Sequence, residues 1–261
     1  MTPASSSRDS QQRVRSSHGA LTGRRVLVVG VGGLGCAALV GLRDSGATFV
    51  LADDDRVDLS NLHRQLLFTE RDVGRDKLDA ARDALLTYGV RAQDVELVRS
   101  RFLPENARQL ARSVDLVLEG ADNFATKFLA ADACFLERKP VVHGSAIRFE
   151  ATAWCVAAAA RPCYRCLFED VPASGERQLS CNEAGVLGPV VGLCGAFMAE
   201  LALRYFTGLD AQHDCIHTLD GRRNRVRSIR VAARAGCALC GDQPSIDEII
   251  ENRYTAPSCA A

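Results

Sequence analysis

Apolar and polar residues alternate in blocks along the first half of the chain. Continuous apolar or β-branched runs are typical of strands buried on both faces, and they occupy 25–29, 48–53, 95–98, 114–118 and 140–142. Good helix formers fill 33–45, 75–88 and 123–138, and a further helix is predicted to start at Pro104. Strands and helices in alternation predict a doubly wound, parallel α/β sheet.

The pattern changes after Ser145. A polar loop is predicted at 169–183 and a long apolar helix at 188–206. Further apolar runs, interpreted as strands, lie at 152–157, 216–219 and 226–231. The C-terminal third is predicted to be antiparallel, which makes the whole sheet mixed.

The expected domain limits follow from where the chain has apolar residues to bury. Residues 1–18 are rich in Ser, Arg and Gln, and we expect a disordered tail there. A single domain is expected over 19–241, followed by a polar C-terminal tail at 242–261.

Charge and hydropathy narrow the choice of partners and location. The chain has 32 basic and 32 acidic residues, so no global field attracts nucleic acid or an anionic membrane, and neither is expected as a partner. No run approaches the roughly 20 apolar residues of a membrane span, and the N-terminal residues lack the apolar segment of a secretory signal. A cytoplasmic location is expected.

Two Cys-x-x-Cys pairs stand out among the eleven cysteines, namely Cys163 with Cys166 and Cys237 with Cys240. In a reducing compartment such pairs favour metal over disulfides. Four thiolates suit a closed, tetrahedral and therefore structural Zn²⁺ site, provided that the two pairs meet in space. The alternative is two redox-active or incidental pairs.

A glycine-rich turn follows the first predicted strand. Gly30, Gly32 and Gly35 satisfy Gly-x-Gly-x-x-Gly between a strand and a helix, where backbone amides and the helix N-terminus meet a phosphate. Asp53 ends the next strand, about 20 residues on, as expected for an acidic residue that binds a ribose hydroxyl. These residues indicate a Rossmann-like nucleotide site. By themselves they also allow dinucleotide binding or a turn that only packs helix on sheet.

The stretch 53–65 is too polar for an ordinary helix or strand and suits a ligand loop. Arg64 in this loop and Lys77 on the next helix are candidate phosphate ligands. For either residue taken alone, a place on a solvated loop or helix face is the favoured interpretation.

These motifs together resemble the ThiF/MoeB/HesA family, relatives of the ubiquitin-activating enzymes. The resemblance covers about residues 25–241 in the right order. Its elements are Gly-x-Gly-Gly-Leu-Gly at 30–35, Asp-x-Asp-x-Val-x-x-Ser-Asn-Leu-x-Arg-Gln at 53–65, Val73-Gly74 with Lys77, Ala121-Asp122-Asn123, Pro-Cys-Tyr-Arg-Cys-Leu at 162–167, and Ala-Gly-Val-Leu-Gly-Pro at 184–189.

The resemblance implies a role for each matched residue. Asp53 would hold the ribose of ATP, Lys77 would bind phosphate, and Asp122 would position Mg²⁺. The alternative role for Asp122 is to cap the helix that follows it, and the two roles are not exclusive. Phosphate or base contacts are implied for Ser60, Asn61 and Arg64, and Gln65 and Asn123 belong to the same ATP-binding set. Cys181 is either a nucleophile that links covalently to the partner protein or an inert loop thiol.

The implied reaction is ATP-dependent adenylation of the C-terminal glycine of a ubiquitin-like (β-grasp) sulfur-carrier protein with a Gly-Gly tail. Pyrophosphate would be released, a separate sulfur donor would act afterwards, and the enzyme would be a homodimer. One departure concerns the family's N-terminal arginine, which acts in trans. This chain offers only Arg8, Arg13 and Arg15 in its Ser-rich tail.

Three alternatives stay open at this point. The chain could adenylate a peptide or small molecule, or it could be a catalytically weak scaffold that binds a ubiquitin-like partner. The glycine turn alone would also fit an NAD-dependent oxidoreductase, although hydride transfer has no need of Arg64, Gln65, Lys77 and Asp122.

Overall fold

A single mixed sheet organises the described part of the chain. The structure is a computed structural model that describes residues 18–172, 184–209 and 212–254. Their sheet has eight strands in the order β3-β2-β1-β4-β5-β6-β7-β8. The strands are β1 (Arg25–Val29), β2 (Thr48–Ala52), β3 (Val95–Val98), β4 (Leu116–Glu119), β5 (Val141–Ile147), β6 (Glu150–Val156), β7 (Cys215–Asp220) and β8 (Arg225–Arg230). In this order, neighbouring strands from β3 through β2, β1 and β4 to β5 pair in parallel, and those from β5 through β6 and β7 to β8 pair antiparallel. This confirms the predicted mixed sheet.

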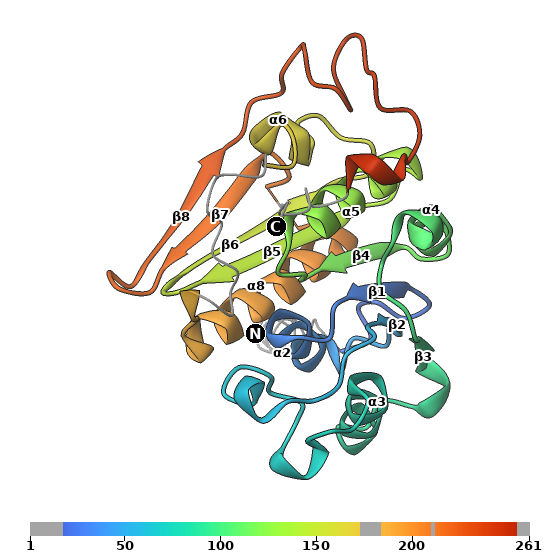
Figure 1. The fold of residues 1–261 in the computed structure, drawn as a ribbon, viewed down its shortest axis with the longest axis vertical. Helices are drawn as coiled ribbons and strands as arrows, with labels where there is room; N and C mark the ends of the chain where they lie inside the picture. Colours follow the sequence, from blue (N-terminus) through green and yellow to red (C-terminus); the bar gives the residue numbers. More distant parts are fainter. Residues whose placement is uncertain (1–17, 173–183, 210–211, 255–261) are drawn as a thin grey trace, which may run out of the picture.

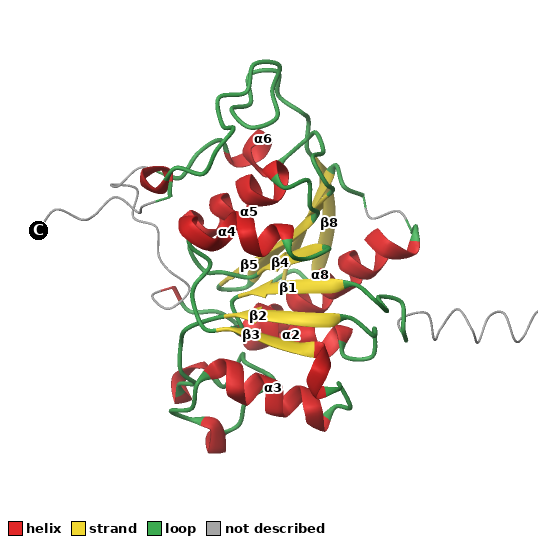
Figure 2. Cartoon of the chain, turned by 90° about the vertical axis from the view of Figure 1, so that its right-hand side faces the viewer, coloured by secondary structure: helices red, strands yellow, loops and turns green. Residues whose placement is uncertain are grey.

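Helices cover both faces of this sheet (Figures 1 and 2). They are α2 (Gly33–Leu42), α3 (Lys77–Thr87), α4 (Pro104–Arg112), α5 (Phe124–Leu136), the short α6 (Tyr164–Phe168) and α8 (Gly188–Thr207). Successive side chains of β1 alternate between two cores. Val26 and Val28 pack with α2, α3 and α8, whereas Leu27 and Val29 pack with α4 and α5.

α8 is the core helix of one face, packed along α2. The approach is close because small residues line it, and a Cβ on Gly195 would lie 2.5 Å from the carbonyl oxygen of Leu34. By length and composition alone α8 is apolar enough to span a membrane, with a mean hydropathy of 1.4. The sequence-based expectation that no run approaches the length of a membrane span is therefore wrong for α8. The helix has only two charged residues, Glu200 and Arg204, and they do not offset its many apolar ones.

Element ends differ from the predicted ones for local reasons. α3 starts at Lys77 rather than Arg75 because the Asp76 side chain accepts a hydrogen bond from the Leu78 amide and caps the helix. β5 runs through Gly144 to Ile147 because it pairs along its whole length with β6. Neither α6 nor the 3₁₀ helices η1 (Leu59–Asn61), η2 (Glu70–Asp72), η3 (Ala92–Asp94) and η4 (Glu251–Arg253) were expected.

Packing continues past residue 241, where the C-terminal tail was expected to begin. Ile246 and Tyr254 are buried and belong to the core on the α4–α5 face. The η4 turn brings this segment back beside α5 (Figure 1).

Candidate active site

A cavity of about 540 Å³ opens at the carboxyl ends of the parallel strands β1, β2 and β4. β1 lies between β2 and β4 in the sheet, so the connections on its two sides leave in opposite directions. This is the topological switch point at which doubly wound sheets bind ligands. The segments that line the cavity include the glycine turn, the loop after β2, the segment after β3, the β4–α5 turn and the C-terminal segment.

The glycines of the turn have two different roles, in the packing of the turn and in the lining of the cavity. Gly30 has φ +85°, a conformation that favours glycine. A Cβ on Gly35 would lie 2.1 Å from the Gly30 carbonyl oxygen, so Gly35 allows α2 to meet the turn. Gly30, Gly32 and Gly33 line the cavity, whereas Gly35 does not. Gly32 is the N-cap of α2 and provides no side-chain cap, which leaves the first amides of the helix available to an anion.

Asp53 connects the glycine turn to the loop after β2. Its side chain is 8% exposed, and its Oδ2 accepts a hydrogen bond from the Val31 amide at 2.7 Å. Its Oδ1 accepts one from the Asp55 amide at 2.8 Å. A carboxylate accepts up to about four hydrogen bonds, so Asp53 keeps capacity for a ligand hydroxyl at the cavity wall.

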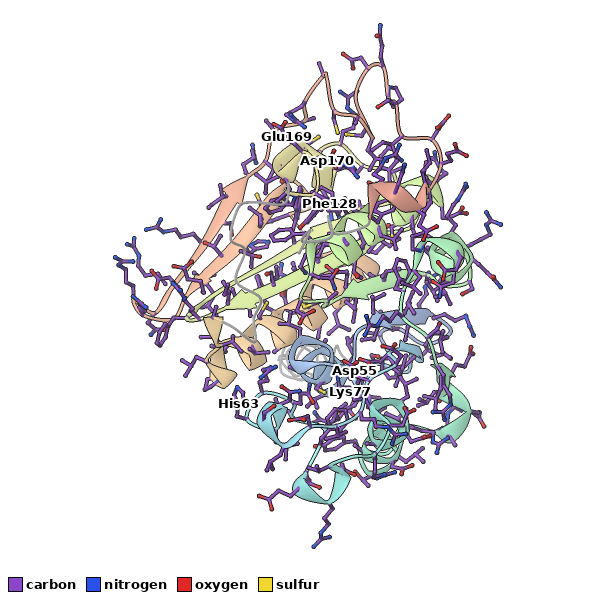
Figure 3. The ribbon with its side chains drawn as sticks, viewed as in Figure 1. Asp55, His63, Lys77, Phe128, Glu169 and Asp170 are labelled. Atoms are coloured by element: carbon purple, nitrogen blue, oxygen red, sulfur yellow. The ribbon has the colours of Figure 1, made fainter. Side chains whose placement is uncertain are left out.

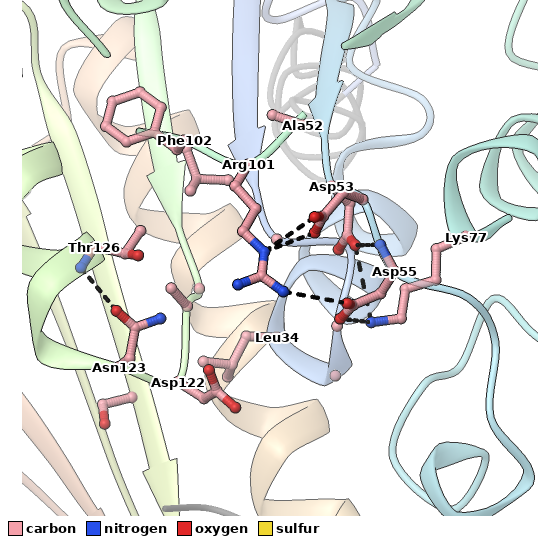
Figure 4. Close-up of a pocket in the computed structure, with 18 of the residues that line it drawn as sticks. Leu34, Ala52, Asp53, Asp55, Lys77, Arg101, Phe102, Asp122, Asn123 and Thr126 are labelled. Carbon is pink, nitrogen blue, oxygen red and sulfur yellow. Dashed lines mark hydrogen bonds and ion pairs between the residues drawn. The ribbon is translucent and has the colours of Figure 1, made fainter. Parts of the chain in front are cut away.

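Two cations, Lys77 and Arg101, face the acidic loop in the cavity (Figure 4). Lys77 is 5% exposed, and its Nζ lies 2.8 Å from Asp55 Oδ2 and 3.9 Å from Asp53 Oδ1. Arg101 donates from Nε to Asp54 Oδ1 at 2.9 Å. Arg101 was not singled out from the sequence. Its place soon after β3, the parallel neighbour of β2, was the signal that could have found it.

The β4–α5 turn carries Asp122 and Asn123 (Figure 4). Asn123 caps α5, since its Oδ1 accepts a hydrogen bond from the Thr126 amide at 2.8 Å. The alternative of Asp122 as the helix cap is therefore wrong. Asp122 lines the cavity, is exposed, and makes no hydrogen bond or ion pair with any residue that the structure describes.

The remaining predicted ATP ligands lie at different distances from the cavity. Asn61, Arg64 and Gln65 line it, and Gln65 Oε1 is buried with no hydrogen-bond partner among the described residues. Ser60 lies outside the lining and donates from its hydroxyl to Asp58 Oδ1. Cys181 lies outside the described residues.

A buried charged network that sequence reasoning did not identify supports the β4–α5 turn. Lys127 Nζ donates to Glu119 Oε2 at 3.0 Å, and His143 Nδ1 lies 3.0 Å from the same oxygen. Burial lowers the pKa of His143 despite the neighbouring carboxylate. Burial opposes ionisation of Glu119, but Lys127 and His143 outweigh it and lower its pKa. Glu119 also accepts the Ala121 amide at 2.7 Å, which fixes the backbone just before Asp122.

The two cysteine pairs meet in space. The four Sγ atoms lie within 4.8 Å of one another, with Cys163 to Cys237 at 3.6 Å and Cys166 to Cys240 at 3.4 Å. Zn–S bonds of about 2.3 Å in a tetrahedron place sulfurs about 3.8 Å apart, so the donor set fits Zn²⁺ closely. The Arg234 amide lies 3.5 Å from Cys166 Sγ, a contact that would support a thiolate.

Comparison with known proteins links this arrangement to one family. The model of the ThiF family matches residues 7–239. The chain is 37% identical over 229 residues to "Adenylyltransferase and sulfurtransferase MOCS3" of Culex quinquefasciatus, and 39% identical over 230 residues to the Drosophila persimilis protein of the same name. These matches cover 87% of the chain and 52% and 50% of the relatives, so the chain spans about half their length.

Solved structures share the fold. The crystal structure of E. coli MccB with ATP has a TM-score of 0.74 at 19% identity, covering 85% of this chain and 68% of that one. PaaA has a TM-score of 0.66 at 23% identity, covering 81% and 65% of the two chains.

Proposed function

Because the chain belongs to the ThiF family, as its motifs suggested, we propose that it uses ATP to adenylate the C-terminal carboxylate of a ubiquitin-like sulfur-carrier protein. The observation that carries this proposal is the convergence of the glycine turn, Asp53, Lys77 and Asp122 on one cavity at the switch point of the sheet. The curated relatives named above are described as adenylyltransferases, which supports the same reaction class.

The proposed orientation of ATP follows the polarity of the cavity. Asp53 would accept a ribose hydroxyl, and the first amides of α2 would face the phosphates. Lys77 and Arg64 would pair with phosphate oxygens. In Figure 4 Phe102 and Lys77 lie on opposite sides of the cavity, with Arg101 between them. The base would accordingly occupy the Phe102 side.

The acidic loop positions Lys77 for the proposed contact with phosphate. Its pairing with Asp55 keeps the ammonium at the cavity although the side chain is almost fully buried. A triphosphate carries more negative charge than Asp55, so it would compete for the same ammonium. The Asp122 carboxylate lies at the cavity wall without a partner among the described residues, and it is the residue that would hold Mg²⁺, an ion that would supply positive charge near the phosphates.

The proposed chemistry needs positioning more than covalent help from the protein. A carboxylate oxygen of the carrier attacks the α-phosphorus, a new P–O bond forms, the bond to the β-phosphate oxygen breaks, and pyrophosphate leaves. Positive side chains would stabilise the negative charge that develops on the phosphate oxygens. Each such contact contributes about 2–4 kcal/mol by analogy with oxyanion donors.

Three finer proposals accompany this function. Cys163, Cys166, Cys237 and Cys240 would hold one structural Zn²⁺, which agrees with a reducing, cytoplasmic location. A homodimer is also proposed, because α8 exposes apolar side chains. Leu193 is 59% and Leu66 55% exposed, and Leu66 lies beside α8 at Gly192.

Cys181 is proposed to receive the activated carrier after adenylation, without a part in forming the adenylate. The thiolate would attack the acyl carbon and AMP would leave. In a Cys181→Ser variant, ATP–pyrophosphate exchange should survive and a thiol-sensitive covalent adduct with the carrier should vanish. An adduct that persists in this variant would assign the reactive thiol to another residue.

The decisive test of the function is ATP–pyrophosphate exchange with a panel of Gly-Gly-tailed β-grasp proteins. Exchange should need the carrier, and a carrier without its last two glycines should give none. Exchange only with a peptide or small molecule would favour that alternative substrate. Carrier binding without exchange would favour the scaffold, and tight NAD binding without ATP binding would favour the oxidoreductase.

A further inference from the structure

The C-terminal segment returns to the proposed nucleotide cavity. Tyr254, just after η4, is 5% exposed and lines that cavity. It shares one apolar cluster with Phe102 and Leu129, which also line the cavity. This aromatic and aliphatic end contrasts with the charged end at Lys77, and it suits the flat, weakly polar surface of a nucleobase.

A buried ion pair holds Tyr254 in place. Its hydroxyl donates to Asp132 Oδ2 at 2.6 Å, and Asp132 on α5 is fully buried. Arg165 donates two hydrogen bonds to the same carboxylate, from Nε at 2.8 Å and from Nη2 at 2.9 Å. Burial, together with the adjacent carboxylate, raises the pKa of Tyr254, so its hydroxyl keeps the proton that it donates.

The Asp132–Arg165 ion pair is itself held in place by the cysteine cluster. Arg165 lies between Cys163 and Cys166 in sequence, and its guanidinium lies 4.8 Å from the Phe128 ring. It also donates to the Glu169 carbonyl and to Asp170, which lie above Phe128 in Figure 3. Tyr254 is thus connected to the cysteine cluster through two side chains.

We propose that Tyr254 is a base-recognition residue, whose ring forms the wall against which the nucleobase packs and whose position depends on the Asp132–Arg165 pair. The proposal rests on the proposed binding of ATP in this cavity. It adds a specificity-determining residue from a segment that carries no phosphate-binding motif.

The test compares a ligand that has a base with one that lacks it. Dissociation constants for Mg²⁺-ATP and for Mg²⁺-tripolyphosphate are measured by calorimetry on the full chain and on Tyr254→Ala. We expect at least about a tenfold weaker affinity for ATP, the scale of losing one aromatic contact with a base, and less than about a twofold change for tripolyphosphate. Tyr88→Ala, which removes an exposed tyrosine outside the cavity lining, should leave both affinities unchanged.

The possible failures are distinguishable. A wild-type chain that binds no ATP overturns the proposed function. A wild-type chain that binds ATP, with Tyr254→Ala binding it equally well, overturns the role of Tyr254 alone. Equal losses for ATP and tripolyphosphate also overturn it, because a general distortion of the cavity would explain them.

Two further variants keep the proposal testable if Tyr254→Ala fails to fold. Tyr254→Leu retains an apolar side chain without the ring, and the same selective loss of ATP affinity is expected. Tyr254→Phe retains the ring and loses the hydrogen bond to Asp132, for which we expect about a threefold selective loss. Wild-type ATP affinity in both variants would overturn the proposal.

Discussion

Asp122 offers the sharpest test at the scale of single residues. Asp122→Asn should lower ATP–pyrophosphate exchange by at least about a hundredfold, because it removes a charge expected at the reacting phosphates. The melting temperature should change little, since the carboxylate has no protein partner among the described residues.

Asp247→Asn is the matched control for this variant, because Asp247 is also exposed but does not line the cavity. Both variants should melt together, and only Asp122→Asn should lose exchange. Full exchange in Asp122→Asn would remove Asp122 from the proposed metal site.

Single residues also mark the limit of what the sequence could predict. Asp53, Lys77 and Asn61 were found because their types and spacings fall in known motifs, and the structure places all three in the cavity lining. Arg101 and Tyr254 belong to no such motif. They reach the cavity through strand order and through a buried ion pair, which are tertiary facts that spacing does not encode.

Between elements, a carboxylate clamp joins α4 to α5. Glu137, at the C-terminal end of α5, accepts hydrogen bonds from Arg112 and Arg108 of α4, and these bonds lower its pKa to about 2. Its reference pKa is 4.5. The clamp is therefore complete above about pH 4.5 and is lost as the pH falls toward 2.

The free energy of unfolding should follow the charge of this clamp. Between pH 5 and pH 2.5 the wild type should lose on the order of 1–2 kcal/mol more than Glu137→Gln, a figure reduced for the partial exposure of both arginines. Urea unfolding at several pH values measures the difference. Parallel curves for the two proteins would show that the pair contributes no stability.

The cysteine cluster ties α6 to the segment that follows β8. Purified protein should contain about one Zn²⁺ per chain, and removing it with a chelator should lower the melting temperature. Cys237→Ser should abolish metal retention, whereas Cys215→Ser, outside the cluster, should not. Folded, reduced protein without zinc would refute the assignment.

The positions of the strands and of the longer helices could be predicted because the hydrophobic period and the length of each agreed. β1 was predicted to its last residue, since its continuous apolar run serves two cores at once. α6 escaped prediction because its five residues are too few to show a helical period, and the Cys163–Cys166 turn sets its position.

On the scale of the whole molecule, the apolar surface of α8 predicts self-association. Light scattering should give the mass of two chains, and Leu193→Glu should shift that mass to one chain because it places a charge in the proposed contact. Thr207→Glu, at the exposed end of the same helix, is the control and should stay dimeric. A wild-type mass of one chain would refute the dimer.

The mixed architecture could be predicted from pattern alone, but the order of the strands could not. Alternating strands and helices indicated a parallel sheet, and the later runs indicated antiparallel additions. That β1 pairs with β4 on one side and β2 on the other is decided by packing across the sheet.

The pairing of β1 with β4 sets the order in which a nascent chain gains its ligand site. Val26 of β1 pairs with Leu116 of β4, which lies far along the chain. The glycine turn is therefore synthesised long before the strand that leads to Asp122. Such distant pairing closes late in folding. A ribosome-bound chain that ends before β4 would hold half a nucleotide site, and ATP, by binding only the completed cavity, would stabilise finished molecules alone.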